Sequence, residues 1–409
     1  MASSLLILSN SDSGLYDFRK EVLKALLEKG FRVAVSVPDT GYVDKIKALG
    51  CEYIPTSFER RGMNPVKDMK LMLFYRRLMK EYRPLAVLTY TIKPNIYGGL
   101  AARLTGTPYL VNVTGLGTTL ENGGLLQKMI ILMYRTALKK AGCVFFQNKG
   151  NRDFMVQKKC ASGKVRVIPG SGVNLTEHRP EEYPEDGGQI RFVSVMRLMK
   201  DKGIEELMAA AQTVHEKHPE TLFQILGAYE EETRDVYEPR VKELQEKGIL
   251  MHYGYRDDVP VFLKECQAVI HPSYHEGMSN VLLEAAATAR PVLASAVEGC
   301  LDTFSEGVSG LSFQAQDSSS LAEAAERFLA MSYEERKEMG LQGRKYVEEK
   351  FDRNFVVAAY LEEISAYSRT GKLCRKQLYC FQHLSIKKTD TNETDSGLGG
   401  HRWDYMKNL

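Results

Sequence analysis

The sequence predicts an α/β protein built from two doubly wound domains, each with a parallel sheet. Short apolar segments alternate with helical patterns along most of the 409 residues, as they do in repeated β-α units. The alternation stops once, in the Gly-, Pro- and acid-rich stretch 169–189, and then starts again. At about 150 residues per domain, this length accommodates two such units.

The first run contains seven expected strands separated by helices. The strands are 5–8, 32–36, 51–54, 85–89, 109–113, 143–147 and 165–168, and the clearest helices are 17–29, 65–82 and 125–141. The apolar runs have few polar interruptions, which is typical of parallel strands buried on both faces.

The second run contains five expected strands and ends in helices. The strands are 190–195, 222–226, 250–253, 268–271 and 292–294, with helices near 202–216, 234–247, 258–265, 280–289, 317–331, 333–350 and 352–368. We therefore predict a first domain over 1–168, a linker over 169–189, a second domain over 190–351, a C-terminal helix over 352–369, and a poorly ordered polar tail over 370–409.

Charge divides the chain into unlike halves. Residues 1–180 hold 28 Lys and Arg against 13 Asp and Glu, whereas residues 181–369 hold 20 against 35. The basic excess predicts an anionic partner for the first half, such as a phosphate-bearing substrate, a membrane surface or nucleic acid. The alternatives are that the charge split reflects attraction between the two domains or has no functional meaning. The segment 58–83 mixes basic and bulky apolar residues, which fits either a lipid headgroup layer or a core helix with a solvated basic face.

Several classes of protein are disfavoured. No apolar run is long enough for a membrane span or a secretion signal, so we expect an intracellular protein. The seven cysteines are scattered, without the spacing of a disulfide framework or a zinc site, and most should be buried apolar residues. A nicotinamide-dependent oxidoreductase fits poorly because no G-x-G-x-x-G follows the first strand. Nucleic-acid binding also fits poorly, since no recognition motif accompanies the basic residues.

The most informative segment is 271–295, a buried strand, a loop and a helix that carry Glu276 and Glu284, eight residues apart. Gly277 permits a close turn, and the amides of Met278, Ser279 and Asn280 at the helix start can face an anion. A glutamate further into the helix could accept hydrogen bonds from sugar hydroxyls.

This segment resembles the E-x7-E region of the retaining, nucleotide-sugar-dependent glycosyltransferases of family four, a group with the GT-B fold. Residues 193–203 also resemble the group's strand that ends in an arginine, with a lysine five residues later. The resemblance implies that Arg197 and Lys202 hold the donor diphosphate, whose growing negative charge fixed cations can stabilise. It further implies that Glu276 binds the donor sugar and Glu284 the ribose.

Other stretches match the family in order. Ser13 and Gly14 lie where the family has its glycine-rich first loop, although the usual Gly-Gly is replaced there. Gly227 and Tyr255 lie in segments that resemble the strand ends around the nucleotide base, and 169–174 resembles the hinge. Fold and resemblance together imply two Rossmann-like domains facing a cleft, with C-terminal helices that cross back to the first domain.

A subgroup resemblance also exists. Residues 17–19 and 93–98 resemble bacterial enzymes that extend polyprenyl-diphosphate-linked sugars in capsule and N-glycan assembly, including N-acetylgalactosaminyl transferases. Many family members carry a histidine near the reacting sugar, but the first histidine here is His178, so Thr91 and Lys93 are the nearest candidates on the acceptor side.

The sequence therefore predicts a retaining transferase that moves a HexNAc or hexose unit from a UDP-sugar donor to a polyprenyl-diphosphate-linked acceptor. We expect neither a cofactor nor a metal, because no D-x-D pattern stands out at a strand end. The expected location is the cytoplasmic face of the plasma membrane. A GT-B epimerase, a phosphorylase, and a catalytically silent membrane-associated subunit remain open alternatives.

Overall fold

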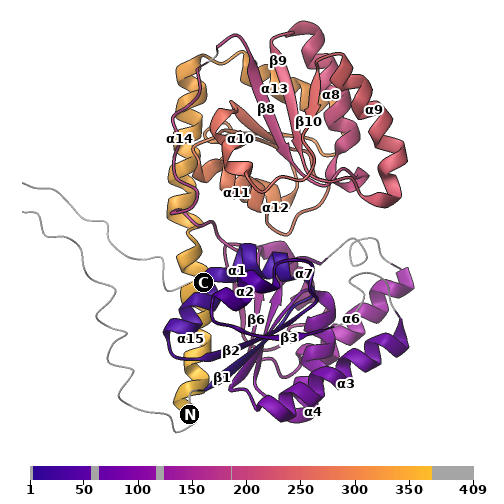
Figure 1. The fold of residues 1–409 in the computed structure, drawn as a ribbon, viewed down its shortest axis with the longest axis vertical. Coiled ribbons are helices and arrows are strands. Elements are labelled where there is room, and N and C mark those ends of the chain that lie inside the picture. The colour runs from indigo at the N-terminus through magenta and orange to yellow at the C-terminus, as the bar shows by residue number, and fades with distance from the viewer. Residues whose placement is uncertain (1–2, 57–63, 117–123, 186, 371–409) are drawn as a thin grey trace, which may run out of the picture. The chain divides into compact units, whose positions relative to one another are not determined.

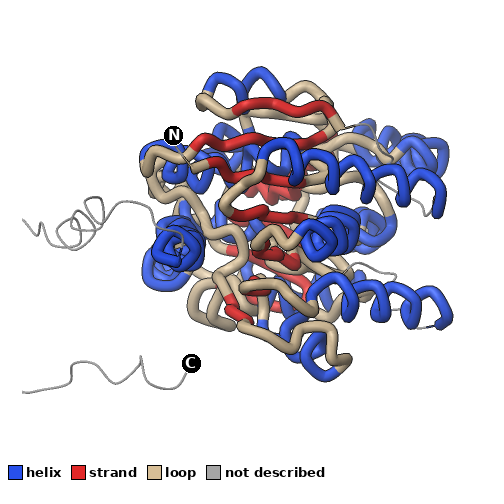
Figure 2. Tube along the Cα trace, turned by 90° about the horizontal axis from the view of Figure 1, so that it is seen from below, coloured by secondary structure: helices blue, strands red, loops and turns tan. Residues whose placement is uncertain are grey.

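The computed structural model describes residues 3–56, 64–116, 124–185 and 187–370, and residues 1–367 form one compact unit. It contains two parallel sheets with helices on both faces (Figures 1 and 2). The predicted tail, 370–409, lies outside the described residues except for its first residue. The predicted domain boundaries remain predictions, although all strands of the two sheets fall within the expected ranges 1–168 and 190–351.

The N-terminal sheet has seven strands in the order β3-β2-β1-β4-β5-β6-β7. Its strands are β1 (Ser4–Leu8), β2 (Arg32–Val37), β3 (Glu52–Pro55), β4 (Ala86–Tyr90), β5 (Tyr109–Val113), β6 (Cys143–Phe146) and β7 (Val165–Val167). Its helices are α1 (Asp12–Glu28), α2 (Val43–Ala48), α3 (Pro65–Tyr82), the π-helical turn η1 (Pro94–Gly98), α4 (Gly99–Thr105), α6 (Gly124–Leu138) and α7 (Lys149–Gln157).

The C-terminal sheet has six strands in the order β10-β9-β8-β11-β12-β13. Its strands are β8 (Ile190–Val195), β9 (Thr221–Leu226), β10 (Leu250–His252), β11 (Ala268–His271), β12 (Val292–Ser295) and β13 (Gly310–Phe313). Its helices are η2 (Lys200–Lys202), α8 (Ile204–Lys217), η3 (Glu231–Thr233), α9 (Arg234–Glu246), α10 (Val259–Glu265), α11 (Asn280–Ala287), α12 (Glu298–Leu301), α13 (Ser318–Leu329) and α14 (Tyr333–Lys350).

Burial explains why the strands read as apolar runs. Leu5, Leu6, Ile7 and Leu8 of the central strand β1 are all fully buried, because helices cover both faces of the sheet. On one face, α3, α4 and α6 enclose a core with β1, β4 and β5, and on the other face α1 does so. All four strand pairings that involve β1 or β8 are parallel, as expected for crossover connections.

The last helix, α15 (Arg353–Thr370), returns to the N-terminal sheet as predicted. Val356, Tyr360 and Ile364 are buried in the core that β1 and α1 share (Figure 1). The Tyr360 ring packs 4.6 Å from that of Phe145 in β6. The C-terminal end of the compact unit is therefore held by the N-terminal core.

Two local predictions need correction. Helix α1 begins at Asp12, not at 17, because Ser11 caps it by accepting a hydrogen bond from the amide of Gly14 at 3.0 Å. The edge strand β13 was not predicted, since its four residues, GLSF, carry little strand signal. Tertiary packing creates it, and a side chain at Gly310 would lie 2.6 Å from Val292 in the neighbouring strand.

Three further predictions concern composition. The five described cysteines, 51, 143, 160, 266 and 300, are free and buried, as expected. Within the described part of the chain, no helix is long and apolar enough to cross a membrane. The mixed segment 58–83 is helical from Pro65, and its residues 58–63 lie outside the described ranges.

Candidate active site

The order of the strands brings the predicted residues to two positions. In each sheet, the order in which successive strands are added reverses beside the first strand. The reversal lies between β1 and β4 in the N-terminal sheet and between β8 and β11 in the C-terminal sheet. Ligands of doubly wound proteins bind at the carboxyl ends of strands flanking such a reversal. Ser13 and Thr91 follow β1 and β4, whereas Arg197 and Glu276 follow β8 and β11.

Glu276 lies in a compact polar cluster. Its Oε1 contacts Lys202 Nζ and lies 3.0 Å from His271 Nε2, and Lys202 Nζ also lies 3.3 Å from Ser273 Oγ. Burial alone would raise the pKa of Glu276, but the hydrogen bond and charge of His271 and the charge of Lys202 hold it well below 4.5. Glu276 is therefore a fixed carboxylate beside a cation, suited to accept hydrogen bonds from hydroxyl groups.

Arg197 lies apart from this cluster. Its guanidinium forms an ion pair with Glu230, in the loop after β9, and its side chain is about half exposed at 49%. The structure thus brings Lys202 and Glu276 together but directs Arg197 toward an acid that the sequence did not single out. To bind a diphosphate beside Lys202, the Arg197 guanidinium would have to break its ion pair with Glu230 and bind the phosphate oxygens in its place.

The start of α11 is only partly available to an anion. Ser279 caps the helix, and its own amide donates to the carbonyl of Gly299 at 3.0 Å. The Met278 side chain is buried against Gly170, and the Asn280 side chain contacts Ser171. Of the three predicted amides, that of Ser279 therefore already has a protein partner.

Two glycines permit close backbone approach. A Cβ on Gly227, where φ is +147°, would lie 1.8 Å from the carbonyl oxygen of Met196, so β8 and β9 end too close together for a side chain. A Cβ on Gly277 would lie 2.3 Å from the carbonyl oxygen of Thr114, after β5. Both glycines are required by packing, whatever they contact in a ligand.

Tyr255 presents its ring to solvent beyond β10. It is 65% exposed, and its hydroxyl lies 3.0 Å from that of Tyr42, in the loop between β2 and α2. An exposed aromatic ring at a strand end can stack on a nucleotide base. The Tyr42 contact was not foreseen, because it joins residues 213 positions apart.

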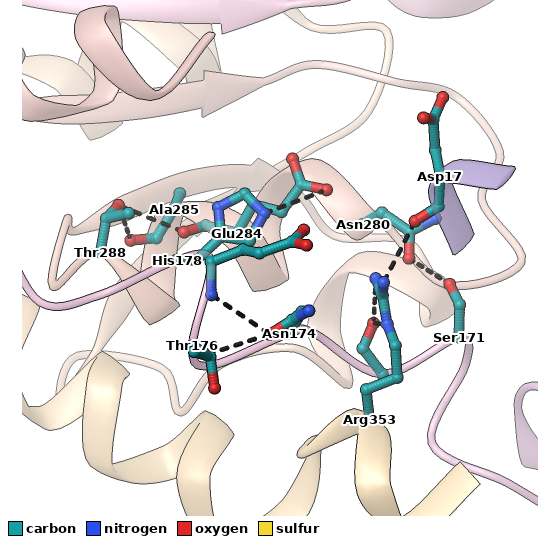
Figure 3. A network of polar contacts seen from close by, with 12 residues as sticks. Asp17, Ser171, Asn174, Thr176, His178, Asn280, Glu284, Ala285, Thr288 and Arg353 are labelled. Carbon is teal, nitrogen blue, oxygen red and sulfur yellow. Dashed lines mark hydrogen bonds and ion pairs between the residues drawn. The ribbon is translucent and has the colours of Figure 1, made fainter. Parts of the chain in front are cut away.

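Glu284 lies one helical turn after Asn280 and faces His178 of the linker (Figure 3). The distance between Glu284 Oε1 and His178 Nε2 is 4.0 Å. Burial raises the pKa of Glu284 to about 7 and lowers that of His178 to about 4. Near neutral pH the histidine is uncharged, so the two side chains form no full ion pair, and His178 Nδ1 is buried without a hydrogen-bond partner.

Ser13 and Gly14 form the first turn of α1. The side chain of Asp12 anchors this turn by accepting hydrogen bonds from the amides of Ser13, Thr40 and Tyr42, at 2.8, 2.7 and 3.0 Å. These bonds, together with the Thr40 hydroxyl, outweigh burial and lower the pKa of Asp12. Asp12 thus has a positioning role in this turn.

Thr91 and Lys93 differ in their surroundings. Thr91 adopts φ of +72°, a left-handed conformation that is costly for a β-branched residue and is most common at functional sites. The Lys93 side chain is only 14% exposed, and its Nζ lies 3.0 Å from Asp68 of α3. Tyr97 donates to the other oxygen of Asp68 at 3.0 Å. The structure therefore shows Lys93 in an internal ion pair that fixes η1 against α3.

Sequence reasoning missed Glu230, His271, His178 and Asp68. Glu230 and Asp68 act on Arg197 and Lys93, which lie 33 and 25 positions away, and His178 faces Glu284 from the linker, so no local spacing signals these three. His271 lies only five residues before Glu276, and its role depends on how the intervening loop folds back. Among the described residues, no group of three His, Cys, Asp or Glu side chains could hold a metal ion.

Two family models match the chain. Residues 4–148 match "Glycosyl transferase 4-like", and residues 176–346 match "Glycosyl transferases group 1". The first match covers β1 to β6 of the N-terminal sheet, and the second covers the whole C-terminal sheet.

Curated relatives include three bacterial proteins. The N,N'-diacetylbacillosaminyl-diphospho-undecaprenol alpha-1,3-N-acetylgalactosaminyltransferase of Campylobacter jejuni is 26% identical over 334 residues, covering 77% of this chain and 86% of that protein. The UDP-Gal:alpha-D-GlcNAc-diphosphoundecaprenol alpha-1,3-galactosyltransferase of Escherichia coli is 28% identical and covers 64% and 70%. The capsular polysaccharide biosynthesis glycosyltransferase CapM of Staphylococcus aureus is 24% identical and covers 73% and 80%.

Solved structures share the fold. Anabaena HepE in complex with UDP-glucose superposes with a TM-score of 0.74 at 17% identity, covering 89% of this chain and all of that one. The sucrose-phosphate synthase of Thermosynechococcus elongatus superposes with a TM-score of 0.73 at 20% identity, covering 90% of this chain and all of that one. At these identities the likeness establishes the two-sheet GT-B architecture alone.

Proposed function

Because this chain belongs to the glycosyltransferases, with a 4-like module followed by a group 1 module, we propose that it is a retaining transferase that uses a UDP-sugar. The sugar is a HexNAc or hexose unit, and the acceptor is a saccharide linked to a polyprenyl diphosphate. Such a reaction belongs to the assembly of a surface polysaccharide or glycan.

The observation that carries this proposal is the Lys202–Glu276–His271 cluster. It lies at the point where the strand order of the C-terminal sheet reverses, between β8 and β11, beside the start of α11. A carboxylate with a lowered pKa next to an ammonium group can bind sugar hydroxyls and a diphosphate oxygen at neighbouring positions. A binding protein for a neutral saccharide has no need of such a cation.

In the proposed reaction, the bond between the anomeric carbon and the diphosphate oxygen breaks, and a bond to the acceptor oxygen forms on the same face. The acceptor hydroxyl gives its proton to the departing diphosphate. Lys202 and Arg197 stabilise the negative charge that develops on the leaving group, and Glu276 holds the donor sugar. Glu284 accepts hydrogen bonds from the ribose hydroxyls.

Metal independence is part of the proposal. Fixed side-chain cations can neutralise a leaving diphosphate without a divalent ion. Lys202 contacts Glu276 and Ser273, and Arg197 follows the end of the same strand, β8, which supports this part of the proposal. Retention of the anomeric configuration is proposed from the resemblance of residues 271–295 and 193–203 to the retaining glycosyltransferases of family four.

The acceptor is proposed from the relatives and the charge. Two of the relatives are named for undecaprenol-linked diphosphate substrates. Residues 1–180 carry an excess of 15 basic residues, from 28 Lys and Arg against 13 Asp and Glu, which suits an acceptor diphosphate in an anionic leaflet. We propose that the protein acts peripherally at the cytoplasmic face of the plasma membrane.

The first test is a thermal-shift screen with UDP, GDP, ADP and nucleotide sugars in the presence of EDTA. A ligand that binds only the native state raises the melting temperature, so UDP should raise it selectively without metal. No shift with any nucleotide would contradict the proposed donor site and favour a silent membrane-associated subunit.

The second test supplies UDP-HexNAc and UDP-hexose donors with a short-chain, water-soluble polyprenyl-diphosphate sugar. We expect acceptor-dependent product whose new linkage has the donor's anomeric configuration by NMR. A changed donor sugar without acceptor would instead indicate an epimerase, and dependence on inorganic phosphate would indicate a phosphorylase.

A further inference from the structure

Large apolar side chains are exposed along α3 and α6. On α6, Leu125 is 86% exposed, Leu132 is 61% exposed and Met129 is 42% exposed. On α3, Val66 is 66% exposed, Met69 is 53% exposed and Leu73 is 48% exposed. We call these six residues the apolar ridge. Five of them belong to the N-terminal halves of their helices, and Leu132 lies one residue past the middle of α6.

The ridge is distinct from the faces that build the core. Helix α3 buries Leu71, Tyr75 and Leu78, and α6 buries Ile130 and Tyr134. Each helix is therefore anchored by one apolar stripe and presents a second one outward. A helix that is apolar on two sides has a further surface to cover.

Both parts of the ridge lie on the same side of the sheet and at the same edge. Helices α3 and α6 both pack against η1 and α4 (Figure 1). A helix that connects parallel strands runs antiparallel to them, so its N-terminal half lies at the carboxyl ends of the strands. Thr91, on the proposed acceptor side, follows the carboxyl end of β4.

The charges beside the ridge are basic. Lys70 and Lys128 are exposed next to Met69 and Met129, and the α6 sequence contains no acidic residue. Asp68, the one acid in the first half of α3, is 5% exposed and is paired internally with Lys93. The lysines therefore lie beside apolar side chains with no exposed carboxylate on these helical segments.

We propose that the apolar ridge and its flanking lysines form a docking face for an anionic lipid bilayer. The apolar side chains enter the boundary between headgroups and acyl chains, and the lysines contact the lipid phosphates. The inference rests on the proposed function and specifies its membrane partner. Docking in this way would place the acceptor-side edge of the N-terminal sheet at the depth of a polyprenyl diphosphate headgroup.

A bilayer fits this face better than a protein partner does, because of the charge. Protein interfaces are depleted of lysine at their centre, whereas lysine beside bulky apolar residues is characteristic of helices that lie in an anionic interface. Each lysine near such a surface contributes roughly a fivefold gain in partitioning at low salt.

The experiment is sedimentation of the full-length protein with vesicles of phosphatidylcholine alone or mixed with phosphatidylglycerol. The test variant is Leu125→Gln, Met129→Gln and Leu132→Gln combined, and the charge variant is Lys70→Gln with Lys128→Gln. The matched control replaces three exposed apolar residues of other helices, Val236→Gln, Val261→Gln and Leu341→Gln, whose exposures are 57%, 51% and 46%.

We expect wild type and control to bind the mixed vesicles equally, and the test variant to bind about tenfold more weakly or worse. The charge variant should lose affinity for mixed vesicles but not for pure phosphatidylcholine. Equal binding by test variant and wild type, equal losses in test and control, or no binding by wild type would each overturn the proposal. Melting temperatures of all variants identify any loss caused by unfolding.

Catalysis separates this inference from the proposed function. With the short-chain soluble acceptor, the test variant should match the wild-type turnover, while with a long-chain acceptor embedded in mixed vesicles its turnover should fall with its binding. If wild type transfers no sugar to either acceptor, the proposed function fails. If both proteins use the embedded acceptor equally, only the docking face is refuted.

Discussion

Replacing Glu284 by glutamine should stabilise the protein in a manner that depends on pH. The side chain is only 23% exposed, and burial raises its pKa from 4.5 to about 7. His178, the near neighbour in Figure 3, offers no charge in compensation, since burial lowers its own pKa to about 4. An ionised Glu284 is therefore a cost to the folded state.

The size of this effect on the free energy of unfolding follows from its linkage to protonation of Glu284. Between about pH 4.5 and pH 7 the unfolded chain has released the Glu284 proton and the folded protein retains it, so the free energy of unfolding falls as pH rises. Each pKa unit corresponds to about 1.4 kcal/mol, which gives a total cost of about 3 kcal/mol above pH 7. Glu284→Gln removes this cost, so its advantage should be below about 1 kcal/mol at pH 5 and about 3 kcal/mol at pH 8.5.

Urea denaturation of wild type and Glu284→Gln at pH 5 and pH 8.5 tests this, with the exposed Glu349→Gln of α14 as control. UDP affinity measured on the same samples should fall in Glu284→Gln if the carboxylate receives the ribose. A stability difference that is the same at both pH values, or one that Glu349→Gln reproduces, would refute the reasoning about burial.

Three further outcomes are expected. Lys202→Met should lower turnover on the order of 100-fold with intact folding, measured by initial rates and circular dichroism, because it removes a cation from the leaving group; unchanged rates would exclude that role. Thr91→Gly should raise the free energy of unfolding by about 0.5–1 kcal/mol, because glycine relieves the strain of a φ of +72°, and it should also raise the KM for the acceptor. The control Lys159→Gly, at a φ of +56°, should stabilise the protein without changing the kinetics. Arg290→Met should lower the free energy of unfolding, measured in urea, by about 3–5 kcal/mol, since this fully buried guanidinium donates to six backbone carbonyls. The control Arg327→Met, at a side chain that is 59% exposed, should change the free energy of unfolding little.

The two sheets were predictable because their information is local. Apolar runs such as 5–8 and 268–271 can be buried on both faces only in a parallel sheet, and the break at 169–189 separates the two series. The exact start of α1 and the existence of β13 were not predictable. The first depends on a single cap at Ser11, and the second on a neighbouring strand that gives GLSF its hydrogen bonds.

The sequence by itself determined which chemistry each strand end carries. The spacing of Glu276 and Glu284 places one before α11 and the other inside it, and strand alternation places Arg197 after β8. Only the tertiary structure decided the partners. Lys202 meets Glu276 across 74 residues because β8 and β11 are neighbours in the sheet. Arg197 faces Glu230 because β8 and β9 are also neighbours, whereas Lys93 pairs with Asp68 because η1 packs on α3. A charge finds its partner through distance in space, and strand order, not chain spacing, sets that distance.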